Sequence, residues 1–418
     1  MANPSIKKFR LSARVGAMAA MLLPLGAGTS HAAEELPPFE APGESYSLVA
    51  PGDVGTYHET DTLEPIPSPL THDLSLHCEA PAVTESSGTW LRRGLWYADL
   101  EAVIMSRTWD SDGVFIAEEP SITSPFQVPI RQDEIGASSP GAEGLARLTL
   151  GRFLFRDLKN RDHNAEMLIQ GGGEWNEELD LQADTAGGIQ VPLLLTGLGV
   201  RPNFSGATDM ELTYSSRLTN WEWNYSVTER LRRDRMELLP SGKWVRRASP
   251  GLTREYLAGL RLIDIQENID WTAENISTLN GSDGTYLIRT SNNLFGIQLG
   301  YGMTYETDRW NITLSTKQGF FVVDERSTSN FIVPDAATNV DFATEAHENR
   351  LSYLAQMSIL ARYHIRPNLS LRAGWELMYL TNLALAPNQI DFSPVAAPIA
   401  ATADSVYHGF TVGTEYYW

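Results

Sequence analysis

The last nine residues of the chain alternate between two kinds of side chain. Phe410, Val412, Thr414, Tyr416 and Trp418 form a larger or less polar set, and smaller or more polar residues lie between most of them. Because a β-strand sends successive side chains to opposite faces, the two sets lie on opposite faces of one strand. One face suits lipid and the other a polar lumen, which is typical of a strand in a membrane-spanning barrel. An edge strand of a soluble sheet is the alternative.

The chain also ends on an aromatic residue. A C-terminal strand with a terminal aromatic resembles the signal by which assembly machinery recognises the barrels of bacterial outer membranes. The residues expected to carry this signal are Phe410, Val412, Tyr416 and Trp418. The partners that it implies are outer-membrane lipid and the barrel-assembly machinery.

Residues 1–32 are predicted to be a secretory signal peptide that is cleaved near Ala32. Four basic residues precede an apolar segment at 15–25, which is too short to span a bilayer. Beyond this segment no apolar run is long enough for a transmembrane helix. A closed barrel is then the remaining way for the chain to cross lipid, which predicts a location in the bacterial outer membrane.

Cleavage removes four of the 32 Lys and Arg and none of the 52 Asp and Glu, so the mature chain has a net charge of −24. This charge argues against nucleic acid as a partner. Residues 33–91 contain eleven acidic residues, eight Pro and no Lys or Arg. This composition predicts a disordered, acidic, Pro-rich periplasmic tail, which is a candidate tether to a cell-wall or periplasmic partner. The only cysteine, Cys78, cannot form an intramolecular disulfide.

Residues 92–418 are predicted to form an all-β, transmembrane, antiparallel, up-and-down barrel. The clearest strand runs from Leu351 to Ile365, where every second residue is apolar or aromatic, and it is long enough for a tilted membrane strand. About ten such segments can be counted, near 95–107, 143–156, 163–175, 208–227, 252–268, 285–303, 309–323, 349–366, 368–381 and 405–418.

The connections alternate in length, which is typical of a barrel with short periplasmic turns, long external loops and both termini in the periplasm. The segment 228–251 does not fit, because it is long and basic where a short turn is expected. It predicts an extra hairpin, which either extends two strands below the membrane or, with the candidate strand at 189–193, raises the count to twelve. The expected long external loops are 108–142, 176–207, 269–284, 324–348 and 382–404.

From about residue 90 to the end, the chain resembles the type 7 β-barrel porins, an outer-membrane family of planctomycete bacteria. The resemblance rests on several short strings and single residues: Thr213-Tyr-Ser-Ser216, Gly259-Leu-Arg261 with Glu267, Thr290 to Gly300, Lys317, Leu383-Ala-Leu-Ala-Pro387-Asn-Gln389, and His408-Gly409 before the terminal Trp418. Leu260 and Leu262 depart from the aromatics that are common in the family. The resemblance implies an outer-membrane barrel with a porin role, and it assigns no functional residues.

Charged residues at inward positions are the candidate functional residues of the lumen. They are Arg261, Glu267, Lys317, Arg362, His364, Arg372 and Glu376. Arg261 with Glu267, and Arg372 with Glu376, share a face of their strands, so they are expected to pair as a ladder that fills a small lumen. A selective ion path is the alternative.

The expected function lies between a porin-like role and that of a structural or surface protein. Barrels of about eight strands are filled by their side chains and porins need about sixteen, so about ten strands predict a narrow or plugged polar lumen. An open diffusion porin for small solutes is the alternative, and an outer-membrane hydrolase is less favoured. His347 and His364 lie about 55 Å apart along one extended segment and cannot share a site.

No enzyme activity, cofactor or metal is expected. The chain has no hydrolase, metalloprotease or P-loop motif. The segments 110–113 and 280–284 resemble fragments of calcium loops but lack the remaining carboxylates.

Overall fold

The computed structural model describes most of the chain from Trp96 to Trp418. Residues 1–95 lie outside the described residues, and so do the predicted signal peptide and tail. The same is true of 110–113, 121–128, 136–140, 160, 185–187, 192–203, 233–234, 239, 241–243, 248–250, 275–282, 308, 334–340, 367 and 396. None of the described residues belongs to a helix that is long and apolar enough to cross a membrane.

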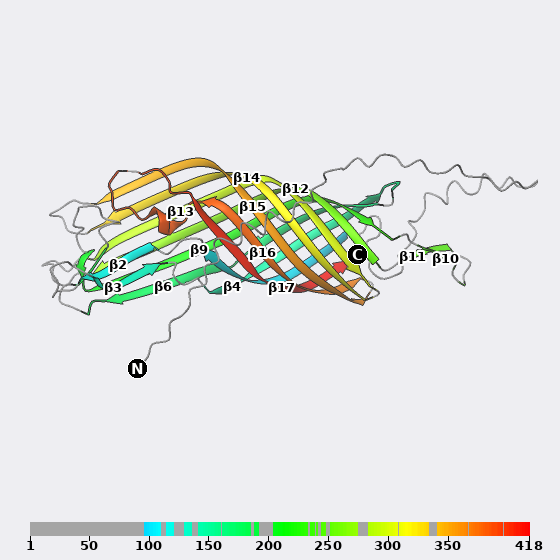
Figure 1. The fold of residues 1–418 in the computed structure, drawn as a ribbon, viewed down its shortest axis with the longest axis horizontal. Coiled ribbons are helices and arrows are strands. Elements are labelled where there is room, and N and C mark those ends of the chain that lie inside the picture. The colour runs from blue at the N-terminus through cyan, green and yellow to red at the C-terminus, as the bar shows by residue number, and fades with distance from the viewer. Residues whose placement is uncertain are drawn as a thin grey trace, which may run out of the picture. The chain divides into compact units, whose positions relative to one another are not determined.

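Ten antiparallel strands form a closed ring (Figure 1). The ring closes because β1 pairs with β4 on one side and with the last strand, β17, on the other. In ring order the strands are β1 (Trp96–Trp109), β4 (Ala142–Arg156), β5 (Arg161–Gly171), β9 (Asp209–Arg230), β12 (Gly251–Glu274), β13 (Gly284–Glu306), β14 (Trp310–Ile332), β15 (Phe342–Arg366), β16 (Leu369–Leu383) and β17 (Ala403–Tyr417). The expected ring of about ten strands is confirmed.

The seam between β17 and β1 depends on two glycines. A Cβ atom on Gly409 would lie 2.0 Å from the carbonyl oxygen of Ile104, and one on Gly413 would lie 2.2 Å from that of Leu100. Both distances are far below van der Waals contact, so a side chain at either position would force the two strands apart. Glycine therefore permits the close approach at which the ring closes.

One wall of the barrel is interrupted. β5 pairs with the second half of β9, while β6 (Glu174–Gln182) pairs with its first half. Gly171 to Gly173 separate the two strands, and Gly172 has a φ of 97°, which favours glycine. β5 and β6 thus act as one long strand with a break.

The segment 228–251 does not add strands to the ring. β10 (Arg235–Leu238) and β11 (Trp244–Arg247) form a separate two-stranded hairpin between β9 and β12, at the barrel end where Trp96 and Trp418 pair. The twelve-strand alternative is therefore not found in the described residues. A four-stranded sheet made of β2 (Val114–Pro120), β3 (Pro129–Ile135), β7 (Ile189–Gln190) and β8 (Ser205–Ala207) belongs to the connections at the other end.

Several strands are longer than the sequence predicts. β6 occupies part of the expected loop 176–207, β12 continues to Glu274, and β14 and β15 take up most of 324–348. These extensions keep the period of two but carry polar side chains outward, such as Arg326 and Thr328. Because the outward residues of these extensions are polar, the sequence predicts loops where the structure has strands.

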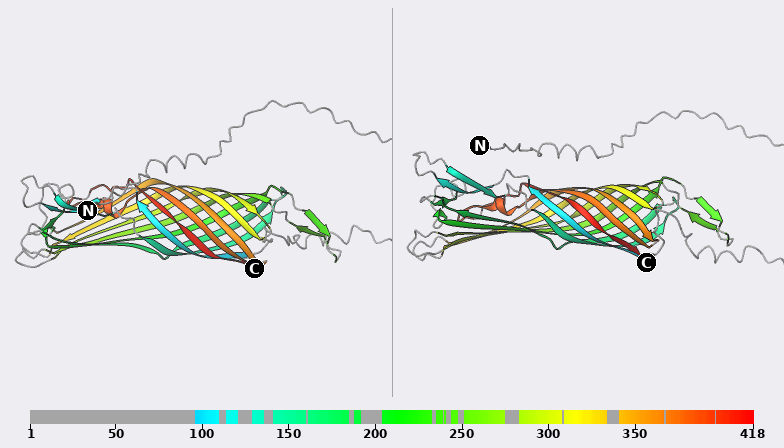
Figure 2. Two further views of the ribbon diagram at one scale, coloured as in Figure 1. Left: turned by 60° about the horizontal axis from the view of Figure 1, so that its bottom comes forward. Right: turned by 90° about the horizontal axis from the view of Figure 1, so that it is seen from below.

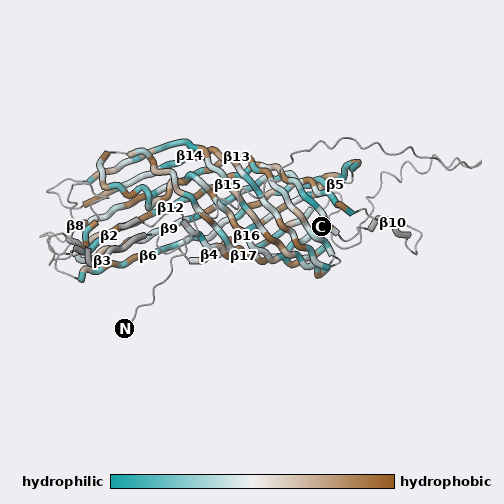
Figure 3. Tube along the Cα trace, in the orientation of Figure 1, coloured by the Kyte–Doolittle hydropathy of each residue, from teal (hydrophilic) through white to brown (hydrophobic). Residues whose placement is uncertain are grey.

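We call the part of the ring nearer Trp96 and Trp418 the lower barrel, and the part beyond it the upper barrel. On β14 the boundary lies after Val322. In the lower barrel the outward side chains are large, apolar and exposed, as Leu100, Phe295 and Ile297 show. Tyr305, Trp310, Tyr416 and Trp418 lie near the strand ends, where membrane barrels carry aromatic girdles. Hydropathy alternates along these strands (Figure 3).

The upper barrel has the opposite arrangement. Outward positions are polar, whereas inward positions form a buried cluster of 21 hydrophobic residues, which includes Phe204, Trp271, Tyr286 and Phe331. The connection between β16 and β17 contains the short 3-10 helix η1 (Ala386–Gln389), seen in the further views of Figure 2. Phe392 of this connection belongs to the cluster. The upper barrel thus packs as a soluble β-barrel does, apolar inside and polar outside.

Candidate functional site in the barrel lumen

Glu222 is the centre of one charge network in the lower barrel. Its side chain is 1% exposed and accepts a bond of 2.7 Å from Lys317 Nζ. Arg261 Nη1 lies 3.5 Å from the same carboxylate, and Gln298 Nε2 and Asn224 Nδ2 donate to it at 2.9 and 3.0 Å. These contacts come from β9, β12, β13 and β14, so they tie four neighbouring strands together. A buried carboxylate needs this kind of paired and hydrogen-bonded surrounding.

A second network lies around Arg147 on β4. Its guanidinium contacts Glu376 on β16 and lies 3.2 Å from Glu101 on β1, and it donates to Gln170 at 2.8 Å. Arg372 contacts Asp99 and lies 3.1 Å from Glu101. Glu101 therefore connects the two arginines.

The structure pairs the predicted lumen charges differently from the expected ladder. Arg372 pairs with β1 and not with Glu376, whose partner is Arg147; Arg261 pairs with Glu222 and not with Glu267. Residues four and six apart on one strand are separated by about 13 and 20 Å, which is beyond ion-pair reach. Facing and neighbouring strands bring opposite charges much closer. The prediction of same-strand pairing was wrong for this reason.

The other predicted residues lie lower in the lumen or on the outer face. Arg362 Nε lies 2.6 Å from Glu415, and the His364 ring is 2.8 Å from the Ser370 hydroxyl. The residues of the proposed assembly signal face outward, and three of them, Phe410, Val412 and Trp418, are more than half exposed. Arg107, Arg147, Glu222 and Glu415 were missed, although Glu222 lies at an inward position between Trp221 and Trp223 and could have been identified by parity.

An apolar layer lies in the lumen above these charges. It contains inward side chains from nine ring strands and from β6, and we call it the septum. Each is at most 4% exposed. Its members are Val103, Met105, Leu145, Trp175, Leu218, Ile263, Ile265, Leu294, Phe321, Val323, Leu354, Met378, Leu380, Leu383, Leu385 and Tyr407. A layer of buried apolar side chains is unfavourable for hydrated ions.

A buried ion pair holds the first part of the connection between β16 and β17, residues 384–392, inside the barrel. Arg107 contacts Glu267, both with fully buried side chains, and donates to Ser216 at 2.6 Å. The second carboxylate oxygen of Glu267 accepts from the backbone N–H of Ala386 at 2.7 Å. The Leu383-Ala-Leu-Ala-Pro387 string therefore begins the inserted connection, and Glu267 is the anchor that it meets.

Asn292 makes a second attachment to the same string. Its amide donates to the carbonyl of Ala384 at 2.9 Å and accepts from the N–H of Ala384 at 2.8 Å. Two-point backbone recognition of this kind fixes the position of a segment, because both polar groups of one residue are satisfied. Strings that are distant in the sequence are thus brought together around one inserted segment.

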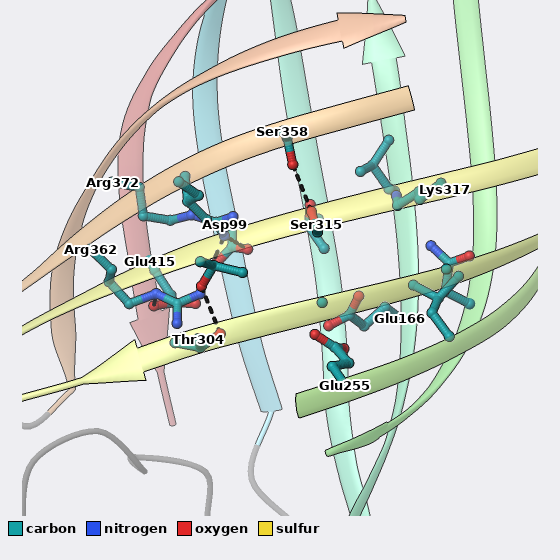
Figure 4. Close-up of a pocket in the computed structure, with 18 of the residues that line it drawn as sticks. Asp99, Glu166, Glu255, Thr304, Ser315, Lys317, Ser358, Arg362, Arg372 and Glu415 are labelled. Carbon is teal, nitrogen blue, oxygen red and sulfur yellow. Dashed lines mark hydrogen bonds and ion pairs between the residues drawn. The ribbon is translucent and has the colours of Figure 1, made fainter. Parts of the chain in front are cut away.

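A cavity of about 270 Å³ lies among the charges of the lower barrel (Figure 4). It extends to the strand ends at Thr253, Glu306 and Tyr417. Nine carboxylates and four cationic side chains line it, so the cavity has an excess of negative charge. It can attract cations and repel anions.

Above the exposed apolar band of the lower barrel, Glu325 is fully buried on the inward face of β14. Burial raises the pKa of its carboxyl to about 7, and the nearby Arg350 partly opposes this shift. Arg350 Nη2 also donates to the carbonyl of Ile399 in the inserted connection at 3.3 Å. Ionisation of Glu325 is therefore coupled to groups that hold this connection.

The upper barrel carries two further polar groups on its outer face. His347 pairs with Asp324, and the carboxylates of Glu178, Asp180 and Glu211 lie close together. All of these side chains point away from the lumen and into solvent, and exposed acidic groups of this kind are common without a ligand.

Comparison with known proteins gives a partial family match. The model of the family described as Putative beta barrel porin-7 (BBP7) matches residues 236–418, which contain β12 to β17. No curated protein matches the chain.

Three solved outer-membrane barrels cover most of the chain at low similarity. They are the outer membrane protease OmpT from Escherichia coli (11% identity, TM-score 0.41, 78% of this chain and 97% of that one), a Pseudomonas aeruginosa FadL homologue (8%, 0.22, 78% and 90%) and the P. putida toluene transporter TodX (8%, 0.20, 78% and 89%). At these sequence identities and TM-scores, the activities and substrates of these proteins say nothing about this chain. The C-terminal part of the chain, residues 236–418, is similar to a porin-like β-barrel family.

Proposed function

We propose that this chain is a bacterial outer-membrane β-barrel with a closed lumen, acting as a structural or surface protein and not as a diffusion pore. The septum carries this proposal, because it crosses the lumen with apolar side chains that are at most 4% exposed. The Arg107–Glu267 pair supports it further by holding residues 384–392 of the connection inside the barrel.

The location in the outer membrane is part of the same proposal. The exposed apolar band of the lower barrel suits lipid, and the family match to a porin-like barrel is consistent with that environment. In this arrangement the termini lie in the periplasm, where the tail can reach a cell-wall partner. The outward face of the last strand, with Trp418, is the proposed recognition signal for the assembly machinery.

A fractionation experiment tests the location. We expect the mature protein in outer-membrane fractions, with an apparent mass on dodecyl sulfate gels that changes on boiling, because a closed barrel resists unfolding by detergent until heated. A protein found in the soluble periplasmic fraction, with no heat-dependent shift, would contradict the membrane proposal.

Conductance of the refolded protein in planar bilayers tests closure. We expect little or no steady current. The alternative function, open diffusion of small solutes, is favoured by the porin-like family match and requires the septum and the inserted connection to move aside. It predicts reproducible openings whose ion preference changes in Lys317→Glu but not in Lys159→Glu, a matched control on the exposed turn after β4. Such channels would overturn the closed-lumen proposal.

Hydrolase activity is the least favoured function. The His347–Asp324 pair faces outward from the upper barrel, and His364 is buried beside Ser370. In neither place do a nucleophile, a base and an orienting acid come together around a substrate cleft. We therefore propose that the protein is not an enzyme.

A further inference from the structure

Two carboxylates face each other in the lower cavity with no cation between them. Glu166 on β5 and Glu255 on β12 both line the cavity, and their carboxylates point toward one another (Figure 4). The hydroxyl of Tyr97 donates to Glu166. Among the described residues, neither carboxylate has a Lys, Arg or His within ion-pair distance, and the nearby Lys317 is engaged by Glu222.

Among the described residues, two buried oxygen atoms on the paired strands β5 and β9 have no hydrogen-bond partner. Asn164 is 3% exposed and lines the cavity, and its Oδ1 has no partner; Ser226 is fully buried, and its Oγ has none either. Such groups are costly to bury unless something satisfies them.

Strand register places Ser226 between the two glutamates along β9. Asn164 and Ser226 are direct partners across β5 and β9, whereas Glu166 is opposite Asn224 and Glu255 is opposite Thr228. All four side chains point to the same side of the sheet, so the two glutamates can reach toward Ser226 from either side. Two like charges in such a place require either a shared proton or a bound cation.

We propose that Glu166, Glu255, Asn164 and Ser226 form a binding site for a hard divalent cation, Ca²⁺, in the lower lumen. The donors are all oxygens, two of them charged, which is the ligand chemistry that Ca²⁺ prefers, and water from the cavity completes the coordination. No His or Cys is present among them, which disfavours zinc and copper. The cation reaches the site from the barrel end where the cavity meets Thr253 and Glu306.

Terbium luminescence of the refolded full chain in detergent tests this site. Tb³⁺ replaces Ca²⁺ at oxygen sites, and the ring of Tyr97, which is hydrogen-bonded to Glu166, is close enough to sensitise it. We expect a bound Tb³⁺ signal that Ca²⁺ displaces, and a melting temperature that rises with Ca²⁺. Removing one charged ligand in Glu166→Gln or Glu255→Gln is expected to weaken Ca²⁺ binding by at least about tenfold.

Glu178→Gln is the matched control, because it removes a carboxylate from the exposed acidic group on the upper barrel. It is expected to retain the affinity of the unmodified protein. The proposal is overturned if Glu255→Gln binds Ca²⁺ normally, or if Glu178→Gln abolishes binding.

A shared proton in place of a cation gives a distinct result. The unmodified protein would then show no Ca²⁺ dependence, and Glu255→Gln would be more stable than it. If the lumen variants do not fold, the Glu178→Gln protein still decides the question, since an absence of Ca²⁺ binding to it also overturns the proposal.

Discussion

The lower and upper parts of this barrel are built from the same strands but bury opposite kinds of side chain. Along β14, the outward residues Ile312, Leu314, Phe320 and Val322 are exposed and apolar, whereas Arg326 and Thr328 further along the same face are polar. The inward residues run from polar Asn311 in the lower part to apolar Phe321 and Val323 at the septum and Phe331 near the upper end, with buried polar residues between them. In the proposed outer-membrane location, one strand therefore serves two solvents, with lipid outside its lower part and water outside its upper part.

The two regions also differ in what fills them. Ion pairs and hydrogen bonds fill the lower barrel around a cavity, while aromatic contacts fill the upper barrel, such as Tyr286 with Phe392 at 4.7 Å. The stability of a region filled by ion pairs depends on each partner being present. A region filled by apolar side chains tolerates substitutions that conserve volume. The septum and the Arg107–Glu267 pair lie where the two kinds of filling meet.

The largest effect is expected at this junction. Glu267→Ala leaves Arg107 fully buried without its carboxylate and removes the acceptor of the Ala386 N–H, so we expect a loss of about 3–5 kcal/mol in unfolding free energy. Denaturant unfolding of the refolded protein measures it. Glu267→Gln, which keeps an acceptor but loses the charge, is the control and should lose less; a Glu267→Gln protein as stable as the unmodified one would mean that the charge does not stabilise the junction.

Charged substitutions on the outer face test the boundary between lipid and water. Ile297→Arg places a charge in the exposed apolar band and is expected to cost about 2–4 kcal/mol in a bilayer. Thr328→Arg, on the outward face of the upper barrel, should change stability by no more than about 0.5 kcal/mol. Both are measured by unfolding from lipid vesicles. A similar cost at the two positions would place the boundary elsewhere.

A smaller effect is expected within the lower network. Glu376→Ala removes one of two carboxylates from Arg147, which keeps Glu101, so we expect a loss of about 2 kcal/mol in unfolding free energy. Glu376→Gln should cost less by keeping a hydrogen bond. Near-neutral values for both would indicate a water-filled lumen, and an open pore would then gain support.

The smallest effect is expected from the pH dependence of the upper barrel. The folded pKa of Glu325 is about 7, above that of a free carboxyl, so the folded state binds this proton more tightly. Its contribution to stability is therefore expected to increase as pH falls from above 7 to about 4.5 and then to level off. The difference in melting temperature between the unmodified protein and Glu325→Gln, measured from pH 8 to 4.5, isolates this contribution. A difference that stays constant over this range would contradict the shifted pKa.

The sequence predicts most of the strands of the lower barrel, because large apolar or aromatic residues alternate clearly with polar ones along them. Trp221, Trp223 and Tyr225 alternate with polar residues, so strand and face are both evident. The same period in β12 beyond Leu262 was assigned in part to a loop, because its outward residues, such as Asp270, are polar. A polar outer face indicates that a strand faces solvent. Loops are polar and solvent-exposed too, so polarity alone does not distinguish the two.

The amino-acid sequence by itself determined the strand period and the inward direction of Arg261, Glu267, Lys317 and Glu376, because side-chain direction follows from local backbone geometry. It predicted about ten strands but left twelve open. Only the tertiary structure decided which charges pair, since Glu376 meets Arg147 across 229 residues of chain. It also decided that an apolar septum lies across the lumen. The septum gathers one to three side chains from nearly every strand of the ring, and the tilt and register that bring them to one level are properties of the closed ring of strands and of no single segment.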